Sequence, residues 1–177
     1  MKQRYVWVVV LMVVLGLVTS CGTNIKKKNI DGSPIWTTEI PKSNKYIYGI
    51  GKARLTLDAN SEQAADTHAR SALSKQIEST LHEFNTLYAT DTEGVALQAY
   101  EQLVIEVVNL TLKQVTLEQR WKASDGTIWS LVSFPVKQIP TLYTGSAKEH
   151  ASGKIDAEKL GKEVAQYLQK TGYDLSE

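Results

Sequence analysis

The sequence contains a single cysteine in 177 residues, and neither sign of charge is in excess, with 20 Lys and Arg against 19 Asp and Glu. One cysteine excludes an intramolecular disulfide and a zinc site built from several thiols. Balanced charge argues against a nucleic-acid-binding protein, because such binding depends on clustered basic residues that neutralise phosphates. The chain also lacks GxSxG, HExxH and phosphate-loop patterns. The sequence therefore gives no indication of an enzyme.

Long apolar runs are confined to the N-terminus. Lys2 and Arg4 precede an apolar stretch over residues 5–18, and the small residues Thr19 and Ser20 follow it. This is the layout of an export signal, and the stretch is shorter than the roughly 20 residues that cross a bilayer. We interpret residues 1–20 as a cleaved signal peptide, and an uncleaved anchor is the less favoured alternative.

The cysteine stands directly after this signal. Val18-Thr19-Ser20-Cys21 resembles the bacterial lipobox, which implies cleavage before Cys21 and acylation of its thiol and new amino group with fatty acids such as palmitate. Several acyl chains anchor a protein without a transmembrane helix. A small buried cysteine is the alternative, but the neighbours Gly22 and Asn24 are not typical of a core. Gly22 replaces the aspartate that, by resemblance to enterobacterial sorting signals, retains a lipoprotein in the inner membrane, so we predict the cell outer membrane and leave its periplasmic or exterior face open.

The segment after Cys21 differs in composition from the remainder of the chain. Residues 21–44 hold Gly, Asn, Ser, Lys and two prolines, and we expect a lipidated, flexible tether to one domain over residues 45–177. Lys26–Lys28 either contact anionic headgroups or form a solvated face of the tether. Trp36 is expected to dock where the chain reaches the domain. The mature chain keeps 18 basic and 19 acidic side chains, because residues 1–20 contain only Lys2 and Arg4 as charged residues.

The domain begins with the stretch YIYGIGKAR, residues 46–54, whose alternation predicts a strand with Gly49 and Gly51 on one face. A nucleotide-binding loop is excluded because the third glycine is missing. A helix is expected to follow, with Asn60 as its N-cap. Its apolar positions recur at helical spacing at Ala65, Ala69, Ala72, Leu73, Ile77, Leu81, Phe84 and Leu87. We expect the bare glycine face to pack against the alanines of this helix.

The second half predicts a helix over residues 93–112, a hairpin that turns at Asp125-Gly126, a loop with Pro140, Gly145 and Gly153, and a helix over residues 155–169. This is an α+β fold: an antiparallel sheet packed by helices in the order β-α-α-β-β-α.

The faces of the hairpin depend on its register. With Ser124 opposite Thr127, the core face holds Val115, Leu117, Trp121, Val132, Phe134 and Val136. The other face then presents Arg120, Lys122, Trp129 and Leu131 beside Thr116 and Glu118, and this is the candidate partner face. The alternative is that Lys122 or Arg120 merely covers Trp129 by a cation–π contact.

Three segments carry a family resemblance: PIWTTEIPKSNKYIYGIGKA (34–53), the Ala-rich helix over residues 59–87, and LEQRWKASDGTIWSLVSFPV (117–136). Together they resemble the Lpp-twenty type of small outer-membrane lipoproteins, the FlgP-like group, although Lys52 stands where that family often has a small residue. The resemblance implies an envelope lipoprotein, associated in some members with the flagellar apparatus, and no catalytic residue.

Two functions are expected from these observations. The first is a structural or interaction role at the outer membrane, by self-assembly or by binding another envelope protein. The second is a periplasmic carrier or sensor whose cavity, between the long helices and the sheet, binds a small apolar ligand and is lined by Tyr46, Tyr48, Tyr100 and Trp121. No cofactor, metal or nucleic acid is expected. His68, His82 and His150 lack metal-site spacing, Glu78 and His82 make at most a surface pair, and Asp91 and Glu93 are interpreted as loop and first-turn charges.

Overall fold

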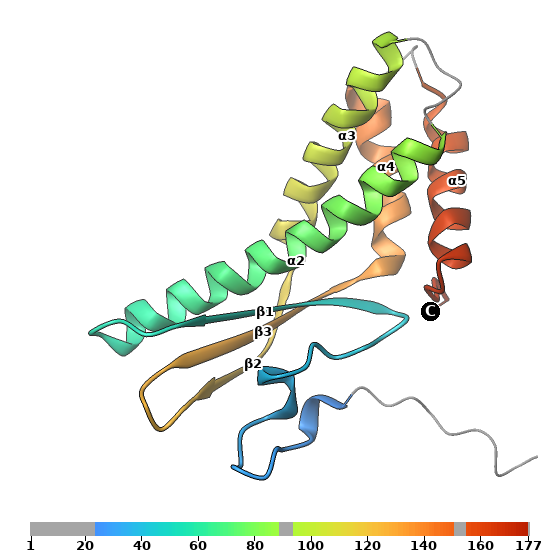
Figure 1. Cartoon of the computed structure of the whole chain (residues 1–177). Helices are drawn as coiled ribbons and strands as arrows, with labels where there is room; N and C mark the ends of the chain where they lie inside the picture. Colours follow the sequence, from blue (N-terminus) through green and yellow to red (C-terminus); the bar gives the residue numbers. More distant parts are fainter. Residues whose placement is uncertain (1–23, 89–93, 151–154, 177) are drawn as a thin grey trace, which may run out of the picture.

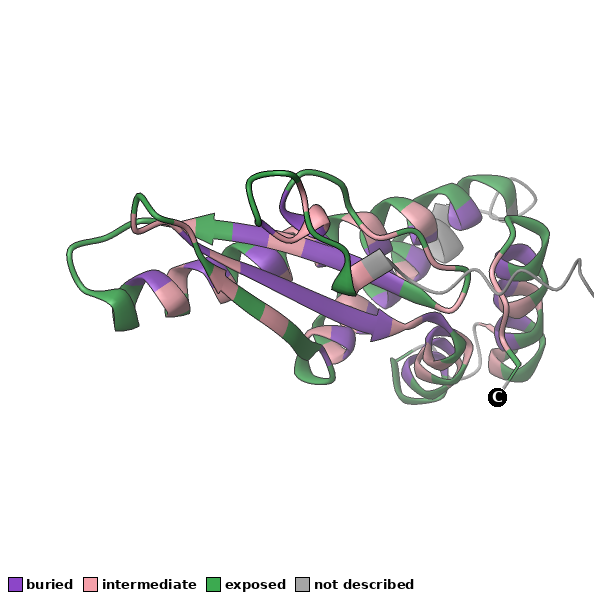
Figure 2. Ribbon diagram, turned by 90° about the horizontal axis from the view of Figure 1, so that it is seen from below, coloured by how far each residue is buried: buried purple, intermediate pink, exposed green. Residues whose placement is uncertain are grey.

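Three strands form an antiparallel sheet in the order β1-β3-β2, so that the last strand of the chain lies in the middle (Figure 1). The strands are β1 (Tyr46–Ala53), β2 (Thr116–Lys122) and β3 (Ile128–Pro135). The computed structural model describes residues 24–88, 94–150 and 155–176. β3 is buried along most of its length, whereas the edge strand β2 is mostly exposed (Figure 2).

The helices are α2 (Asp58–Tyr88), α3 (Gly94–Lys113), α4 (Ile139–His150) and α5 (Ala157–Lys170). The α+β class and the predicted order are confirmed, with one helix more than expected. The loop predicted after the hairpin is wrong, because residues 139–150 form α4. Pro140 lies in the first turn of α4. Backbone N–H groups there have no intrahelical acceptor, so the missing N–H of proline costs no hydrogen bond. Ile139, Tyr143 and Ala147 follow at intervals of four and are fully buried, so the helical signal is present in the sequence.

The expected contact between glycines and alanines is confirmed. A Cβ atom on Gly51 would collide with the carbonyl oxygen of Ala65 and the amide nitrogen of Ala69. One on Gly49 would collide with the Ala69 carbonyl and lie 2.7 Å from the Cβ of Leu73. The backbones of β1 and α2 therefore approach more closely than any residue with a side chain at these positions allows.

Helix α2 begins at Asp58, two residues before the predicted N-cap Asn60. Ser61 is buried at this end, where its Oγ accepts a hydrogen bond from the Leu55 amide at 2.8 Å and lies 3.2 Å from the Leu57 carbonyl oxygen. The prediction of Asn60 as the cap is therefore wrong, since Asn60 lies within the helix. Ser61 makes the hydrogen bonds to the preceding loop instead. The other predicted helices end within two residues of those observed.

The main core fills the space between the α2 side of the sheet and helices α2 to α5. Phe84 of α2 packs edge-on against Tyr143 of α4, with ring centroids 5.9 Å apart and an interplanar angle of 82°. Tyr143 donates a hydrogen bond to Oδ1 of Asn85 at 2.9 Å, and Asn85 donates to the carbonyl oxygen of Tyr100 at 3.2 Å. The Tyr143 hydroxyl, the Asn85 amide and the Tyr100 carbonyl are therefore paired with one another.

The opposite face of the sheet is covered by the N-terminal segment, which we define as residues 24–44. It contains two short 3-10 turns, Asn24–Lys26 and Ile35–Thr37, and lies on the side of the sheet away from the helices (Figure 1). Trp36 is only 1% exposed and packs in a small cluster with Tyr48 and Leu131. The expected docking of Trp36 is confirmed. The packed part of the chain nevertheless begins before residue 45, the predicted boundary, because Trp36 of this segment packs on the apolar residues of this sheet face.

Candidate functional site

The predicted partner face is divided between the two sides of the sheet. Arg120 and Lys122 reach toward α2, whereas Leu131 and Trp129 lie on the side of the N-terminal segment. Leu131 is fully buried there beneath Trp36. The prediction that these four residues share one exposed face is therefore wrong.

The cause is a shift of register at the hairpin. Ala123, not Ser124, opposes Thr127: the Ala123 amide donates to the Thr127 carbonyl at 2.8 Å, and the Gly126 amide donates to the Ala123 carbonyl at 3.0 Å. The connection is thus a three-residue loop, with Gly126 in the left-handed region at a φ of 88°. Because side chains alternate along a strand, moving the register by one residue exchanges the faces of β2.

A β-bulge between Leu117 and Gln119 shifts the pairing again. On the N-terminal side of the bulge Leu117 opposes Val132, and on its C-terminal side Trp121 opposes Trp129. Leu117 is consequently 37% exposed at the edge of the sheet. Val115, Val132, Phe134 and Val136 do share the main core as predicted, but Trp121 belongs to the opposite face.

The two basic residues of β2 have intramolecular partners on α2. Arg120 donates to both carboxylate oxygens of Asp66, at 3.1 and 2.6 Å, and to Glu62 at 3.2 Å. Lys122 donates to Asp58. The alternative in which Arg120 or Lys122 covers Trp129 is therefore wrong, and the cation comes from β1 instead, with Nζ of Lys52 4.9 Å from the Trp129 ring centroid.

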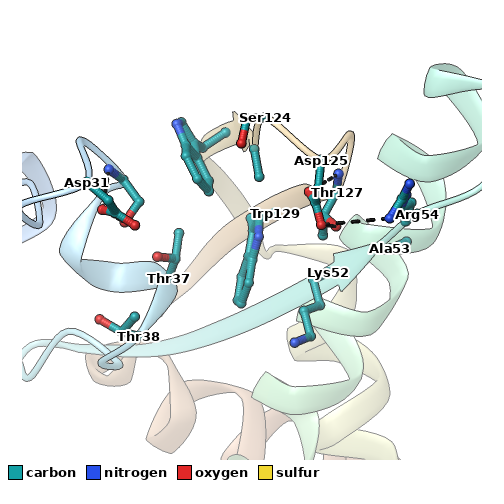
Figure 3. A pocket seen from close by; sticks show the side chains of 13 residues that line it. Asp31, Thr37, Thr38, Lys52, Ala53, Arg54, Ser124, Asp125, Thr127 and Trp129 are labelled. Atoms are coloured by element: carbon teal, nitrogen blue, oxygen red, sulfur yellow. Dashed lines mark hydrogen bonds and ion pairs between the residues drawn. The ribbon is translucent and has the colours of Figure 1, made fainter.

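An open pocket of about 600 Å³ lies beside these tryptophans, where β1 ends and the β2–β3 hairpin turns (Figure 3). Half-buried Trp121 and Trp129 supply its apolar surface. Three parts of the chain supply the polar rim. These are the N-terminal segment with Asp31, Ser33, Thr37 and Thr38, the end of β1 with Lys52 and Arg54, and the hairpin with Ser124, Asp125 and Thr127.

The carboxylates of the rim are already engaged. Asp125 accepts hydrogen bonds from the amide and the hydroxyl of Thr127, both at 2.9 Å, which lower the pKa of its carboxyl, and Arg54 lies 3.9 Å away. Asp31 accepts from the hydroxyl and the amide of Ser33, and these bonds likewise lower its pKa. Both groups are ionised at neutral pH and neither is poised to exchange a proton. The pocket thus combines the apolar faces of two tryptophans with a rim of hydroxyls and charges, the mixture by which concave sites hold and orient a ligand.

Sequence reasoning found one of the two tryptophans and assigned the other to the core. A usable signal was present, because Trp121 and Trp129 stand four residues on either side of Asp125 and therefore pair in a hairpin centred on that residue. The contribution of residues 31–38 carried no such signal, since it depends on a long-range contact.

The three histidines considered as metal ligands do not line the pocket. Nδ1 of His68 lies 2.8 Å from the carbonyl oxygen of Lys52, while His82 and His150 lie 3.8 Å from Glu78 and Glu149, respectively. Across the described part of the chain, no three His, Cys, Asp or Glu residues gather as metal ligands would. The predicted signal peptide (residues 1–20), Cys21, Asp91 and Glu93 lie outside the described residues.

The four aromatic residues expected to line a carrier cavity do not gather in one place, although the ring centroids of Tyr46 and Tyr48 are 6.2 Å apart. Tyr48 and Trp121 lie on the side of the N-terminal segment, Tyr100 belongs to the main core between the helices, and Tyr46 is 42% exposed at the start of β1. The expected cavity between the long helices and the sheet is therefore not lined by these residues.

In residues 24–88, 94–150 and 155–176, no helix has the length and apolar character that a membrane crossing requires. No family model matches the chain, and no curated protein is significantly similar to it. Among solved structures, the chain is similar to the secreted protein HP1454 from the human pathogen Helicobacter pylori, with 13% identity and a TM-score of 0.31. The similarity covers 76% of this chain and 56% of HP1454. The chain thus spans little more than half the length of that protein.

Proposed function

We propose that this chain is a lipid-anchored protein of the cell outer membrane, with a structural or interaction role. The signal-like residues 1–20 and the lipobox-like residues 18–21 support acylation at Cys21. The resemblance to the Lpp-twenty type of lipoprotein supports an envelope location and extends the proposal to flagellar association. Replacing Cys21 with serine is expected to abolish signal processing and to release the protein from membranes; unchanged attachment in this variant contradicts the anchor.

The observation that carries the interaction role is the pair Trp121 and Trp129 at the mouth of the pocket. Tryptophan is enriched among the residues that dominate the energy of protein interfaces, especially when polar groups surround it. Here both rings are partly exposed and are bordered by hydroxyls and charges from three separate segments. The partner is an envelope protein, either a second copy of this chain or a different component.

Binding at this pocket is better supported than pairing through the β2 edge of the sheet. β2 is an exposed edge strand, but its bulge interrupts the row of backbone groups that another strand needs, and Glu118, Arg120 and Lys122 place charges along it. These are the usual features by which an edge strand avoids edge-to-edge association. No specific observation favours the carrier alternative.

Photo-crosslinking from inside the pocket tests the proposal. A benzoylphenylalanine at Ser124, which is exposed and lines the pocket, is expected to give protein adducts in intact cells. The same probe at Gln166, exposed on α5, is the matched control. Combining the Ser124 probe with Trp129→Ala is expected to remove the adducts while the domain stays folded, as circular dichroism and a cooperative thermal melt check. Equal adduct yields from both positions, or none from Ser124, contradict the proposal.

The choice of variant matters here. Leu131→Ala, which is an obvious partner to Trp129→Ala from the sequence, is unsuitable because Leu131 is fully buried. Truncating such a leucine costs about 2–5 kcal/mol of folding free energy, so a loss of binding in this variant would report a loss of structure.

The masses of the crosslinked adducts identify the partner, as copies of this chain or as flagellar or other envelope proteins.

A further inference from the structure

A tight turn in the N-terminal segment presents an apolar side chain to solvent. Residues 28 and 34 form an antiparallel bridge, the Asn29 amide donates to the Ser33 carbonyl at 2.7 Å, and the Gly32 amide donates to the Asn29 carbonyl at 3.0 Å. Gly32 has a φ of 82°, which suits glycine at this position of the turn. Ile30 at its tip is fully exposed, at 110% of its reference area. The backbone thus holds an isoleucine in water, whereas Trp36 of the same segment is only 1% exposed.

Three lysines lie directly beside this turn. Lys26, Lys27 and Lys28 are all exposed, and among the described residues no carboxylate lies within ion-pair distance of them. The nearest acid in the sequence, Asp31, is turned back onto Ser33, 2.7 Å from its hydroxyl. The turn therefore carries a net positive charge around an exposed apolar tip. This combination is typical of segments that bind the surface of an anionic membrane.

The position of the predicted anchor places these residues at that surface. Lys26 follows Cys21 by five residues, and a fully extended chain of that length spans at most about 18 Å. The headgroup layer on one side of a bilayer is itself about 5–8 Å thick. Acyl chains on Cys21 therefore keep the lysines and Ile30 within reach of the lipid headgroups.

We propose that Lys26–Lys28 and Ile30 form a membrane-docking surface, in which the lysines contact anionic headgroups and Ile30 enters the boundary between headgroups and acyl chains. The inference rests on the proposed lipidation of Cys21. It also sets the orientation of the domain, because the N-terminal segment covers one face of the sheet and α2 lies on the other, with α3, α4 and α5 gathered near the end of the sheet (Figure 1). The helices point away from the bilayer, and the tryptophan pocket, to which Asp31 contributes, opens next to the lipid surface.

The sequence allows a direct measurement, because Cys21 is its only cysteine and is consumed by acylation. The full-length lipidated protein carrying Ile30→Cys is labelled with the environment-sensitive fluorophore NBD and placed in vesicles of phosphatidylcholine and phosphatidylglycerol. The label is expected to shift to the blue and to be quenched by lipids with a nitroxide on the acyl chain. The same label at Gln166→Cys, on α5, is expected to report water.

A second variant tests the role of charge. With Lys26, Lys27 and Lys28 all replaced by glutamine, the label at position 30 is expected to leave the bilayer, since three lysines near an anionic surface together change affinity on the order of 100-fold. A label at position 30 that reports water in these vesicles, or that matches the one at position 166, overturns the docking surface. Failure of the anchor itself is seen separately, as vesicle binding that is unaffected by Cys21→Ser.

Discussion

Arg120 on β2 holds Asp66 on α2 through two hydrogen bonds, Nε to Oδ1 at 3.1 Å and a terminal nitrogen to Oδ2 at 2.6 Å. Ser130 of β3 donates a further bond to the same carboxylate at 2.6 Å. One aspartate on the helix thereby fastens the edge strand and the central strand together. A residue that the sequence pattern offered as a partner contact is instead part of the fold.

The first prediction is that Asp66→Asn destabilises the domain by about 1–3 kcal/mol. The substitution removes the negative charge of the pair and puts an NH2 group, which cannot accept, where Oδ2 accepts a hydrogen bond from Arg120. Urea unfolding at pH 7 measures this loss. Asp58→Asn is the matched control, since the Lys122–Asp58 pair has both side chains more than half exposed and is expected to contribute less than about 1 kcal/mol. Equal effects of the two variants contradict the prediction.

The same pair predicts a pH dependence. The hydrogen bond from Arg120 lowers the pKa of the Asp66 carboxyl in the folded protein. A carboxyl whose pKa is lower in the folded than in the unfolded chain stabilises the fold at every pH above its unfolded pKa, which is near 4. This stabilisation is lost as the pH falls through the lower pKa of the folded state. The difference in unfolding free energy between the wild type and Asp66→Asn is therefore expected to be constant above about pH 5 and to shrink below about pH 4. A difference that persists unchanged to pH 2 contradicts this assignment.

The second prediction concerns the close approach of β1 and α2. Gly51→Val is expected to destabilise the domain by several kcal/mol or to prevent folding, because its side chain would collide with the backbone of α2 at Ala65 and Ala69. Gly145→Ala on α4 is the control: the added Cβ would meet no heavy atom within 4 Å beyond its chain neighbours and the backbone of its own helix, and alanine favours a helix over glycine by about 1 kcal/mol. Thermal melts of the two variants are expected to move in opposite directions.

The third prediction tests the buried polar group of the main core. Tyr143→Phe keeps the ring against Phe84 but leaves Oδ1 of Asn85 without its donor, so we expect a loss of about 1–3 kcal/mol. Burial also raises the pKa of the Tyr143 hydroxyl, so this bond persists through the alkaline range. Tyr46→Phe, at an exposed ring, is expected to have an effect within about 0.5 kcal/mol. Denaturant unfolding of both variants separates the hydrogen bond from the general effect of removing a hydroxyl.

Local patterns predicted the parts of this fold that depend on neighbours in the sequence. The period of α2 from Ala65 to Phe84 and the alternation of β1 were sufficient to place both elements and their contact. The site was predicted less well, because it depends on a one-residue choice at the turn. Either Ser124 or Ala123 can oppose Thr127, and that choice decides which side of the sheet Arg120 and Trp121 occupy.

The N-terminal segment shows a different limit. Its composition is that of a linker, and only its packing on the far face of the sheet gives Trp36 a fixed place. The sequence of residues 21–44 alone does not indicate that one face of the sheet would be exposed without this segment. That information lies in Tyr48 and Leu131, on strands that are distant in the sequence.

The last prediction follows from this dependence. Trp36 buries its ring between Tyr48 and Leu131 and donates from Nε1 to the side-chain oxygen of Gln119 at 2.7 Å. Trp36→Ala removes both contacts and is expected to cost about 3–5 kcal/mol of the free energy that holds the segment on the sheet. Hydrogen exchange measures the result by region: the amides of Asn29 and Ile35, which bond within the segment, should exchange rapidly, while those of β3 keep most of their protection. Trp36→Phe, which retains most of the ring, should give an intermediate loss. Equal loss of protection in the segment and in β3 would mean that the segment unfolds only together with the sheet and cannot detach from the domain while the sheet stays folded.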